Sequence, residues 1–220
     1  MLTKKSLDFL KDLAKNNNRD WFHTNKKRYE ADLKLPYEQF ISNLIEAYKE
    51  IDPEISISAK EAVFRIYRDT RFSKDKTPYK THVGALISRH GRKGKESPGN
   101  YIHVETGRLM LGGGAYFMEK ESLLSVRNHI MQNASEFKSI INKPGFVEKF
   151  GEIKGEKHKR IPKEFKEFHE EQPLIANKQF YYMAELPPKM VLGDGGVDYV
   201  MEYFKAGEEL NNFLRTAMGL

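Results

Sequence analysis

The sequence predicts an α+β fold with a mainly antiparallel central sheet flanked by N-terminal and C-terminal helices. Two observations support it. Apolar residues recur at helical spacing in the first and last thirds of the chain, and they alternate every second residue in the middle. Within the middle, Thr106-Gly107 separates two alternating segments as in a tight hairpin. Because helices come before and after the strands as blocks, the sheet is expected to be antiparallel.

We predict a single domain over residues 1–220, a length that can bury one large core. Helices are expected over about residues 3–51 and the sheet over about residues 57–117. Helices and one late strand are expected over about residues 119–218.

The first third carries the pattern of three helices. An apolar stripe over residues 7–13 should end in the asparagine run 16–18, where short polar side chains compete for the backbone. Asp20 can cap a second helix. Pro36 is a favoured first-turn residue and is expected to begin a third.

The middle of the chain carries the expected strands, at residues 62–68, 82–87, 101–105 and 108–111. The run Gly112-Gly113-Gly114 follows the hairpin. It is expected at a tight bend or bulge where the chain leaves the sheet.

The last third returns to a helical pattern. Helices are expected at residues 119–132 and 137–141, a strand near residues 180–184, and a long terminal helix over residues 197–217.

Composition excludes several classes of protein. With 39% hydrophobic and 12% aromatic residues the chain is too rich in large apolar groups to be disordered. No apolar run is long enough to span a membrane, and the N-terminus lacks a secretory pattern, so we expect a cytoplasmic protein without a membrane partner. The absence of cysteine excludes disulfides, thiolate nucleophiles and cysteine-based metal sites.

Charge is distributed unevenly along the chain. Between Arg65 and Lys95 there are ten Lys or Arg residues and two acids, a local balance of +8, whereas the whole chain carries +6. A basic segment on a near-neutral body indicates an anionic partner.

The leading hypothesis places an anion-binding pocket in this basic segment. Arginine offers a fork of donors that matches phosphate oxygens, and residues on one strand face project to the same side. The expected ligand is a small phosphorylated molecule or a nucleotide. The expected binding residues are Arg65, Tyr67, Arg68, Arg71, Lys76, Lys80, His103 and Gly113.

The sequence leaves open whether the protein is an enzyme and which cofactor it uses. If the pocket is catalytic, hydrolysis or transfer at phosphorus is the reaction class to test, with Asp69, Asp75 or His82 as acid or base. His82 and His103 are the histidines that fall on expected strands, and alternation places His103 on one face with Glu105. A histidine near a carboxylate can act as a base or a metal ligand, but no spacing rule supports a metal site and none is predicted.

Two alternatives remain open. The first is a nucleic-acid-binding protein whose basic surface includes Arg89, Arg92, Lys93 and Lys95. The second is a structural or interaction domain in which Arg, Asp and Tyr groups form a buried polar network.

The run FRIYRDTRFSKDKTPYKTHVGA, at residues 64–85, resembles the family known as domain of unknown function 2461. The resemblance continues through GNYIHVE, GGGAYF, the helix with Arg127, Pro144-Gly145-Phe146 and KQFYY, so it covers most of the chain from Trp21 onward. HKRIPKEF, at residues 158–165, is a looser version of the family's pattern. The family has no established activity, so the resemblance implies no function.

Overall fold

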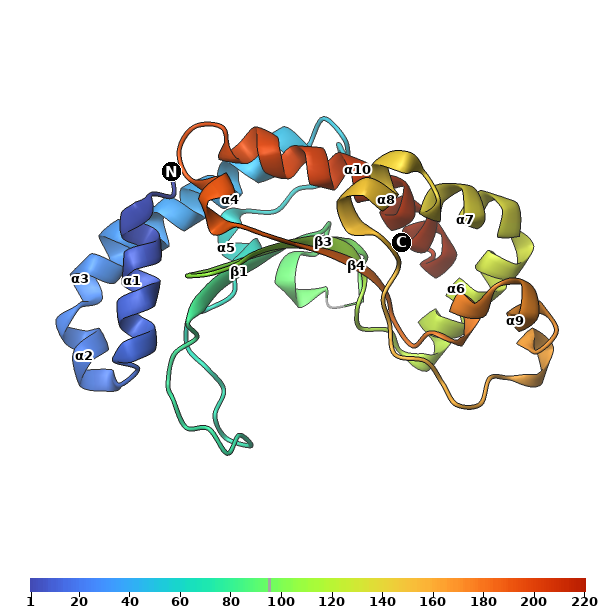
Figure 1. The fold of residues 1–220 in the computed structure, drawn as a ribbon, viewed down its shortest axis with the longest axis horizontal. Helices are drawn as coiled ribbons and strands as arrows, with labels where there is room; N and C mark the ends of the chain where they lie inside the picture. The colour runs from blue at the N-terminus through green and yellow to red at the C-terminus, as the bar shows by residue number, and fades with distance from the viewer. Residues whose placement is uncertain (95) are drawn as a thin grey trace. The chain divides into compact units, whose positions relative to one another are not determined.

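The structure is a computed structural model that describes residues 1–94 and 96–220 (Figure 1). The chain divides into two compact units. Unit 1 consists of Met1–Lys93, Tyr101–Leu111 and Glu185–Glu202, and unit 2 consists of Gly94–Asn100, Gly112–Ala184 and Tyr203–Leu220.

Four strands in the described chain form one antiparallel sheet in the order β1-β2-β3-β4, which confirms the predicted α+β class. The hairpin at Thr106-Gly107 is also confirmed, because the Glu105 amide donates to the Arg108 carbonyl at 2.9 Å. The strands are β1 (His82–Ile87), β2 (Gly99–Glu105), β3 (Leu109–Ala115) and β4 (Phe180–Leu186).

The first helices of unit 1 follow one another closely. They are α1 (Lys4–Lys15), α2 (Arg19–Thr24), α3 (Lys26–Arg28), the π-helical segment η1 (Tyr29–Lys34) and α4 (Leu35–Tyr48).

The predicted third helix is confirmed, with Pro36 in the first turn of α4, although η1 runs directly into α4 without a break. Proline has no amide proton, so Pro36 cannot bond to the carbonyl one turn earlier, at Asp32. The buried Ser6 hydroxyl donates to that carbonyl instead, at 2.6 Å. A side chain of α1 therefore supplies the hydrogen bond that the Asp32 carbonyl cannot receive from Pro36. This hydrogen bond also links α1 to η1.

The core of unit 1 lies between apolar helix faces and one face of the sheet. On α4, Tyr37 is fully covered and its hydroxyl lies 3.5 Å from the carbonyl of Ile102 in β2. From β1, Ala85 and Ile87 point into this core, so the residues that alternate with them, such as His82, lie on the opposite face.

The predicted strand at residues 62–68 is absent. A four-residue helix, α5 (Ala59–Ala62), occupies its start, and the following residues pair with β1 and the chain before it only through isolated bridges at Val63 and Tyr67. The predicted alternation of buried and exposed side chains is present in part of this segment, because Ile66 is buried while Tyr67 is exposed.

The later helices match the predicted pattern. Phe137 from α7 lies in an aromatic core of unit 2 with Phe180 and Phe213, at ring-centroid distances of 6.4 and 5.4 Å. The α-helices are α6 (Lys120–Gln132), α7 (Ala134–Ile141), α8 (Pro144–Phe150), α9 (Phe168–Glu171) and α10 (Gly196–Met218). The 3-10 turns are η2 (Gly91–Lys93), η3 (Lys163–Phe165), η4 (Pro173–Ala176) and η5 (Pro188–Val191). Within the described residues, no helix combines the length and apolar character needed to span a bilayer.

The glycine run lies inside β3, so the predicted tight bend is wrong. A β-carbon on Gly113 would lie 2.4 Å from the Tyr182 hydroxyl and 2.6 Å from the Gly99 carbonyl oxygen. Close packing of these neighbours in unit 2 therefore leaves no room for a side chain at position 113. This packing explains the glycine there, and no bound phosphate is needed to account for it.

We expect Gly113→Ala to lower the free energy of unfolding by about 1–3 kcal/mol, the usual cost of overpacking. Gly107→Ala is the matched control, because a β-carbon on this turn glycine would meet nothing within 4 Å. Chemical denaturation of the three proteins checks this, and equal stability of both variants would contradict the packing explanation.

Candidate functional site

The hairpin of residues 67–79, which we call the arm, extends from the edge of the sheet in unit 1 (Figure 1). Its base is set by two antiparallel bridges, Val63 with Ala85 and Tyr67 with Tyr79. Between the two bridges, residues 64–66 on one side face residues 80–84 on the other. The segment that leads into β1 is therefore two residues longer than its partner, so it must bulge. The bulge falls near His82, at the start of β1.

Most charges on the arm neutralise one another locally. Arg68 donates to Asp75 and to the Thr77 hydroxyl, and Arg71 donates to both carboxylate oxygens of Asp69 at 3.0 and 2.7 Å. The hydrogen bonds from Arg71 lower the pKa of Asp69 to about 2, and those from Thr77 and Arg68 lower the pKa of Asp75 to about 2. Both carboxylates are therefore ionised at neutral pH and are weak bases, which disfavours the predicted acid-base roles.

The remaining predicted cations are spread over the arm and its base. Lys76 donates to the Thr70 carbonyl at 2.9 Å, and the Lys80 ammonium lies 5.3 Å from the centre of the Phe64 ring. Burial, followed by the charge of the exposed Arg65, lowers the pKa of Lys80. None of these cations lines the cavity next to the arm. Of the predicted binding residues, Tyr67 and Arg68 line it.

That cavity is a cleft of about 590 Å³ between α2 and the arm, within unit 1. Asn17 fixes its two walls, because its side-chain amide donates to the Tyr79 carbonyl at 2.9 Å and accepts from the Tyr79 amide at 3.1 Å. Phe22 from α2 stacks on the Tyr79 ring with centroids 4.0 Å apart. Tyr67 contacts both rings and remains 51% exposed. The cleft therefore has an aromatic wall with one accessible ring.

The cleft is also basic. Arg19 and Lys26 line it together with Arg68, against one carboxylate, Asp20. Arg68 is held by Asp75, whereas Arg19 and Lys26 form no ion pair with any described residue. Two exposed cations without carboxylate partners therefore face the same cavity as a positioned guanidinium.

The sequence analysis did not identify Arg19 and Lys26, because both lie outside the basic segment between Arg65 and Lys95. One signal could have found them. Arg19, His23 and Lys26 recur at i, i+4 and i+7, the spacing of one helix face, and all three line the cleft.

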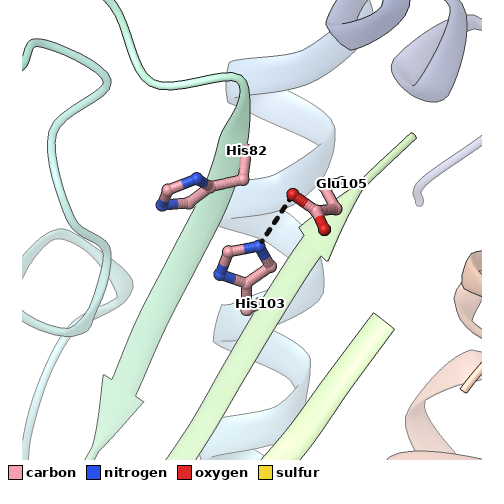
Figure 2. Close-up of side chains that lie close together, drawn as sticks. All are labelled: His82, His103 and Glu105. Atoms are coloured by element: carbon pink, nitrogen blue, oxygen red, sulfur yellow. Dashed lines mark ion pairs between the residues drawn. The ribbon is translucent and has the colours of Figure 1, made fainter. Parts of the chain in front are cut away.

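A second group of candidate side chains lies on the face of β1 and β2 that is opposite the core (Figure 2). His82 on β1 stacks on His103 of β2 with ring centroids 4.1 Å apart. The carboxylate of Glu105 lies 3.4 Å from Nε2 of His103. One donor atom from each of these three residues lies within 4.8 Å of the others. We call His82, His103 and Glu105 the imidazole cluster.

The two rings of the imidazole cluster are neutral at physiological pH. Burial, followed by the effect of the neighbouring His103, lowers the pKa of His82 to about 4. Burial also lowers the pKa of His103 and outweighs the opposing effect of Glu105. Burial raises the pKa of Glu105, but the hydrogen bond from Arg108 and the nearby His103 more than compensate, so this carboxylate is ionised. A base with the low pKa of His82 is inefficient at pH 7, whereas a neutral imidazole is a good metal ligand.

The basic residues of the nucleic-acid alternative are partly engaged in the fold of unit 1. Arg89 binds the buried carboxylate of Asp52 through two nitrogens, at 3.0 and 3.1 Å, and also pairs with Glu54. Arg92 donates to the carbonyl of Lys60. Lys93 is exposed, and Lys95 lies outside the described residues.

Comparison with known proteins bears on the family and not on the site. Neither the curated proteins nor the solved structures contain a significant match to this chain. A protein-family model described as a conserved hypothetical protein matches residues 5–213, nearly the full length. The chain therefore belongs to the conserved hypothetical protein family DUF2461, as the resemblance in its sequence indicates.

Proposed function

We propose that the cleft between α2 and the arm binds a small phosphorylated ligand that carries a planar ring, as a nucleotide does. The observation that carries this proposal is the convergence of Arg19, Lys26 and Arg68 on one cavity with an aromatic wall. Guanidinium and ammonium groups bind phosphate oxygens through charge-assisted hydrogen bonds.

The size and lining of the cleft support this ligand class. A volume of about 590 Å³ falls within the range of about 300–1,000 Å³ that is usual for small-molecule sites. Tyr67 offers an exposed ring for stacking, and Phe22 and Tyr79 support it from behind. Asp20 supplies an acceptor that suits the hydroxyl groups of a sugar.

The pairing of Arg68 with Asp75 and Thr77 has a further consequence for binding. A guanidinium already fixed by two acceptors loses little side-chain freedom when a ligand arrives. Arg19 and Lys26, which have no described ion-pair partner, provide the charge that this carboxylate partly removes from Arg68. Arg68 is therefore preorganised for binding, whereas Arg19 and Lys26 are free to pair with the charge of the ligand.

Removing one free cation should weaken phosphate binding. We expect Arg19→Ala and Lys26→Ala each to reduce the affinity for adenosine monophosphate about 10-fold to 100-fold, since a hydrogen bond to a charged group contributes roughly 1.5–3 kcal/mol. Isothermal titration at low ionic strength measures the effect.

Lys27→Ala is the matched control, because this exposed lysine lies next to Lys26 but outside the cleft lining. It should leave the affinity unchanged. An equal loss in Lys27→Ala, or no binding of adenosine monophosphate to the unaltered protein, would refute the proposed cleft.

The aromatic wall should select for the ring of the ligand. We expect Tyr67→Ala to weaken binding of adenosine monophosphate by about 1–3 kcal/mol, the usual contribution of one stacked base, and to leave inorganic phosphate binding unchanged. Tyr67→Phe keeps the ring and should keep the affinity. Chemical-shift titrations with both ligands check this, and equal losses for the two ligands would show that Tyr67 does not stack.

The contacts of Arg89 disfavour the nucleic-acid alternative, because the side chain of its partner Asp52 is only 4% exposed. We expect Arg89→Ala to destabilise the protein by about 2 kcal/mol or more, less than the 3–5 kcal/mol for fully buried pairs because Arg89 is partly exposed. Affinity for adenosine monophosphate should stay the same in the folded variant. If Arg89→Ala is as stable as the parent and loses affinity for a short oligonucleotide in a salt-dependent way, a nucleic-acid surface is the better explanation.

A further inference from the structure

We propose that His82, His103 and Glu105 form a binding site for a divalent first-row transition metal ion such as Zn²⁺, with a coordination position left open for water. This site is separate from the residues of the cleft and does not depend on the ligand proposed there. Two imidazoles and one carboxylate from adjacent strands place three donor atoms within 4.8 Å of one another.

The state of His103 is the first supporting observation. This residue is only 8% exposed, and its Nε2 makes no hydrogen bond with any described residue, although a Glu105 carboxylate oxygen lies 3.4 Å away. A buried nitrogen without a hydrogen bond is costly unless something binds it. A metal ion between Nε2 and the carboxylate would satisfy both groups.

The other ring nitrogen of His103 is already held. Nδ1 lies 3.2 Å from the hydroxyl of Tyr101, whose pKa is raised by burial so that the phenol stays neutral. If Nδ1–H donates to this hydroxyl, the lone pair of Nε2 is free and points toward Glu105. Metal-binding histidines usually have such a partner on the second nitrogen, which fixes the tautomer and the ring orientation.

The carboxylate of Glu105 is oriented in the same way. Its Oε1 accepts a hydrogen bond from Nε of Arg108 at 2.7 Å, which leaves Oε2 directed at His103 (Figure 2). Arg108 lies across the hairpin from Glu105 and also pairs with Glu185 at 3.5 Å. Two of the three ligands therefore have an outer partner before any ion binds.

His82 completes the set from β1. Its ring stacks on His103 with an interplanar angle of 22°, so the nitrogen lone pairs of the two rings lie in nearly parallel planes and do not meet at one point. An ion about 2.0–2.2 Å from each ligand needs donor atoms roughly 3–3.5 Å apart, so binding requires the His82 ring to turn toward Glu105. Its position beside the bulged edge of the sheet gives this ring the room that the more buried His103 lacks.

The donor set selects the class of ion. Calcium and magnesium prefer oxygen ligands, whereas two imidazoles and a carboxylate suit zinc, iron or manganese. Three protein ligands leave the site open, as in catalytic zinc sites and unlike closed structural ones. Lys80 and Arg108 are nearby positive charges that reduce affinity for a cation, so we expect weaker binding than in a structural zinc site.

The test is isothermal titration of the full chain, freed of metal with a chelator, with Zn²⁺ and with Mg²⁺. We expect one equivalent of Zn²⁺ to bind with heat released and no binding of Mg²⁺ at the same concentrations. Titration with Co²⁺ should produce visible absorption stronger than that of the aqueous ion, because the site has fewer ligands than the six waters of the free ion.

Substitutions identify the ligands. Glu105→Gln and His82→Gln should each weaken Zn²⁺ binding at least about 100-fold, since loss of an outer partner alone typically costs 10–100-fold. His90→Gln changes an exposed histidine outside the cluster and should leave binding unchanged. Circular dichroism verifies that each variant is folded, and both substituted cluster residues are only partly buried.

The result that would overturn the proposal is equal Zn²⁺ affinity in the parent, Glu105→Gln and His82→Gln, or no Zn²⁺ binding to the parent. Affinity for adenosine monophosphate is measured on the same variants and should not change, so failure of the metal site and failure of the cleft are distinguishable. Tyr101→Phe gives a further readout, because it should weaken Zn²⁺ binding about 10-fold or more while leaving all three ligands in place.

Discussion

Both proposed sites depend on the backbone pairing between the chain after α5 and the chain that leads into β1. The bridges Val63–Ala85 and Tyr67–Tyr79 fix where the arm begins, and the unequal lengths of the paired segments require a bulge near His82. The arm forms one wall of the cleft, and the residue at the bulge supplies one member of the imidazole cluster. A shift in this pairing would displace both groups, since a one-residue slip reverses the face on which every side chain lies.

The second constraint is the attachment of the arm to the N-terminal helices. A two-stranded hairpin is only marginally stable by itself, and most charges on this arm pair with each other at exposed positions, where such pairs contribute little. The two hydrogen bonds of Asn17 to the Tyr79 backbone and the stacking of Phe22 on Tyr79 hold the arm against α2. The asparagine run therefore ends one helix and also positions the cleft.

The local pattern of the sequence predicted most of the elements, but it identified only some of the residues in each proposed site. Alternation at residues 101–105 correctly placed His103 and Glu105 on one face, because the two-residue period of a strand is a local property. The same reasoning assigned a regular strand to residues 62–68, where α5 and the bulge interrupt the pairing. The glycine run was expected at a bend or bulge, because the close approach of the Tyr182 hydroxyl and the Gly99 carbonyl, which requires glycine there, comes from distant parts of the chain.

The sequence by itself determined the α+β class, the hairpin at Thr106-Gly107 and the family, because periodicity, turn chemistry and motif runs are written in neighbouring residues. It also placed Tyr67 and Arg68 among the candidate binding residues. Only the tertiary structure joined them to Arg19 and Lys26, and brought His82 beside His103 and Glu105. The physical reason is that convergence depends on strand register and on the packing of α2 against the arm. These are set by contacts between residues far apart in sequence, which no local pattern records.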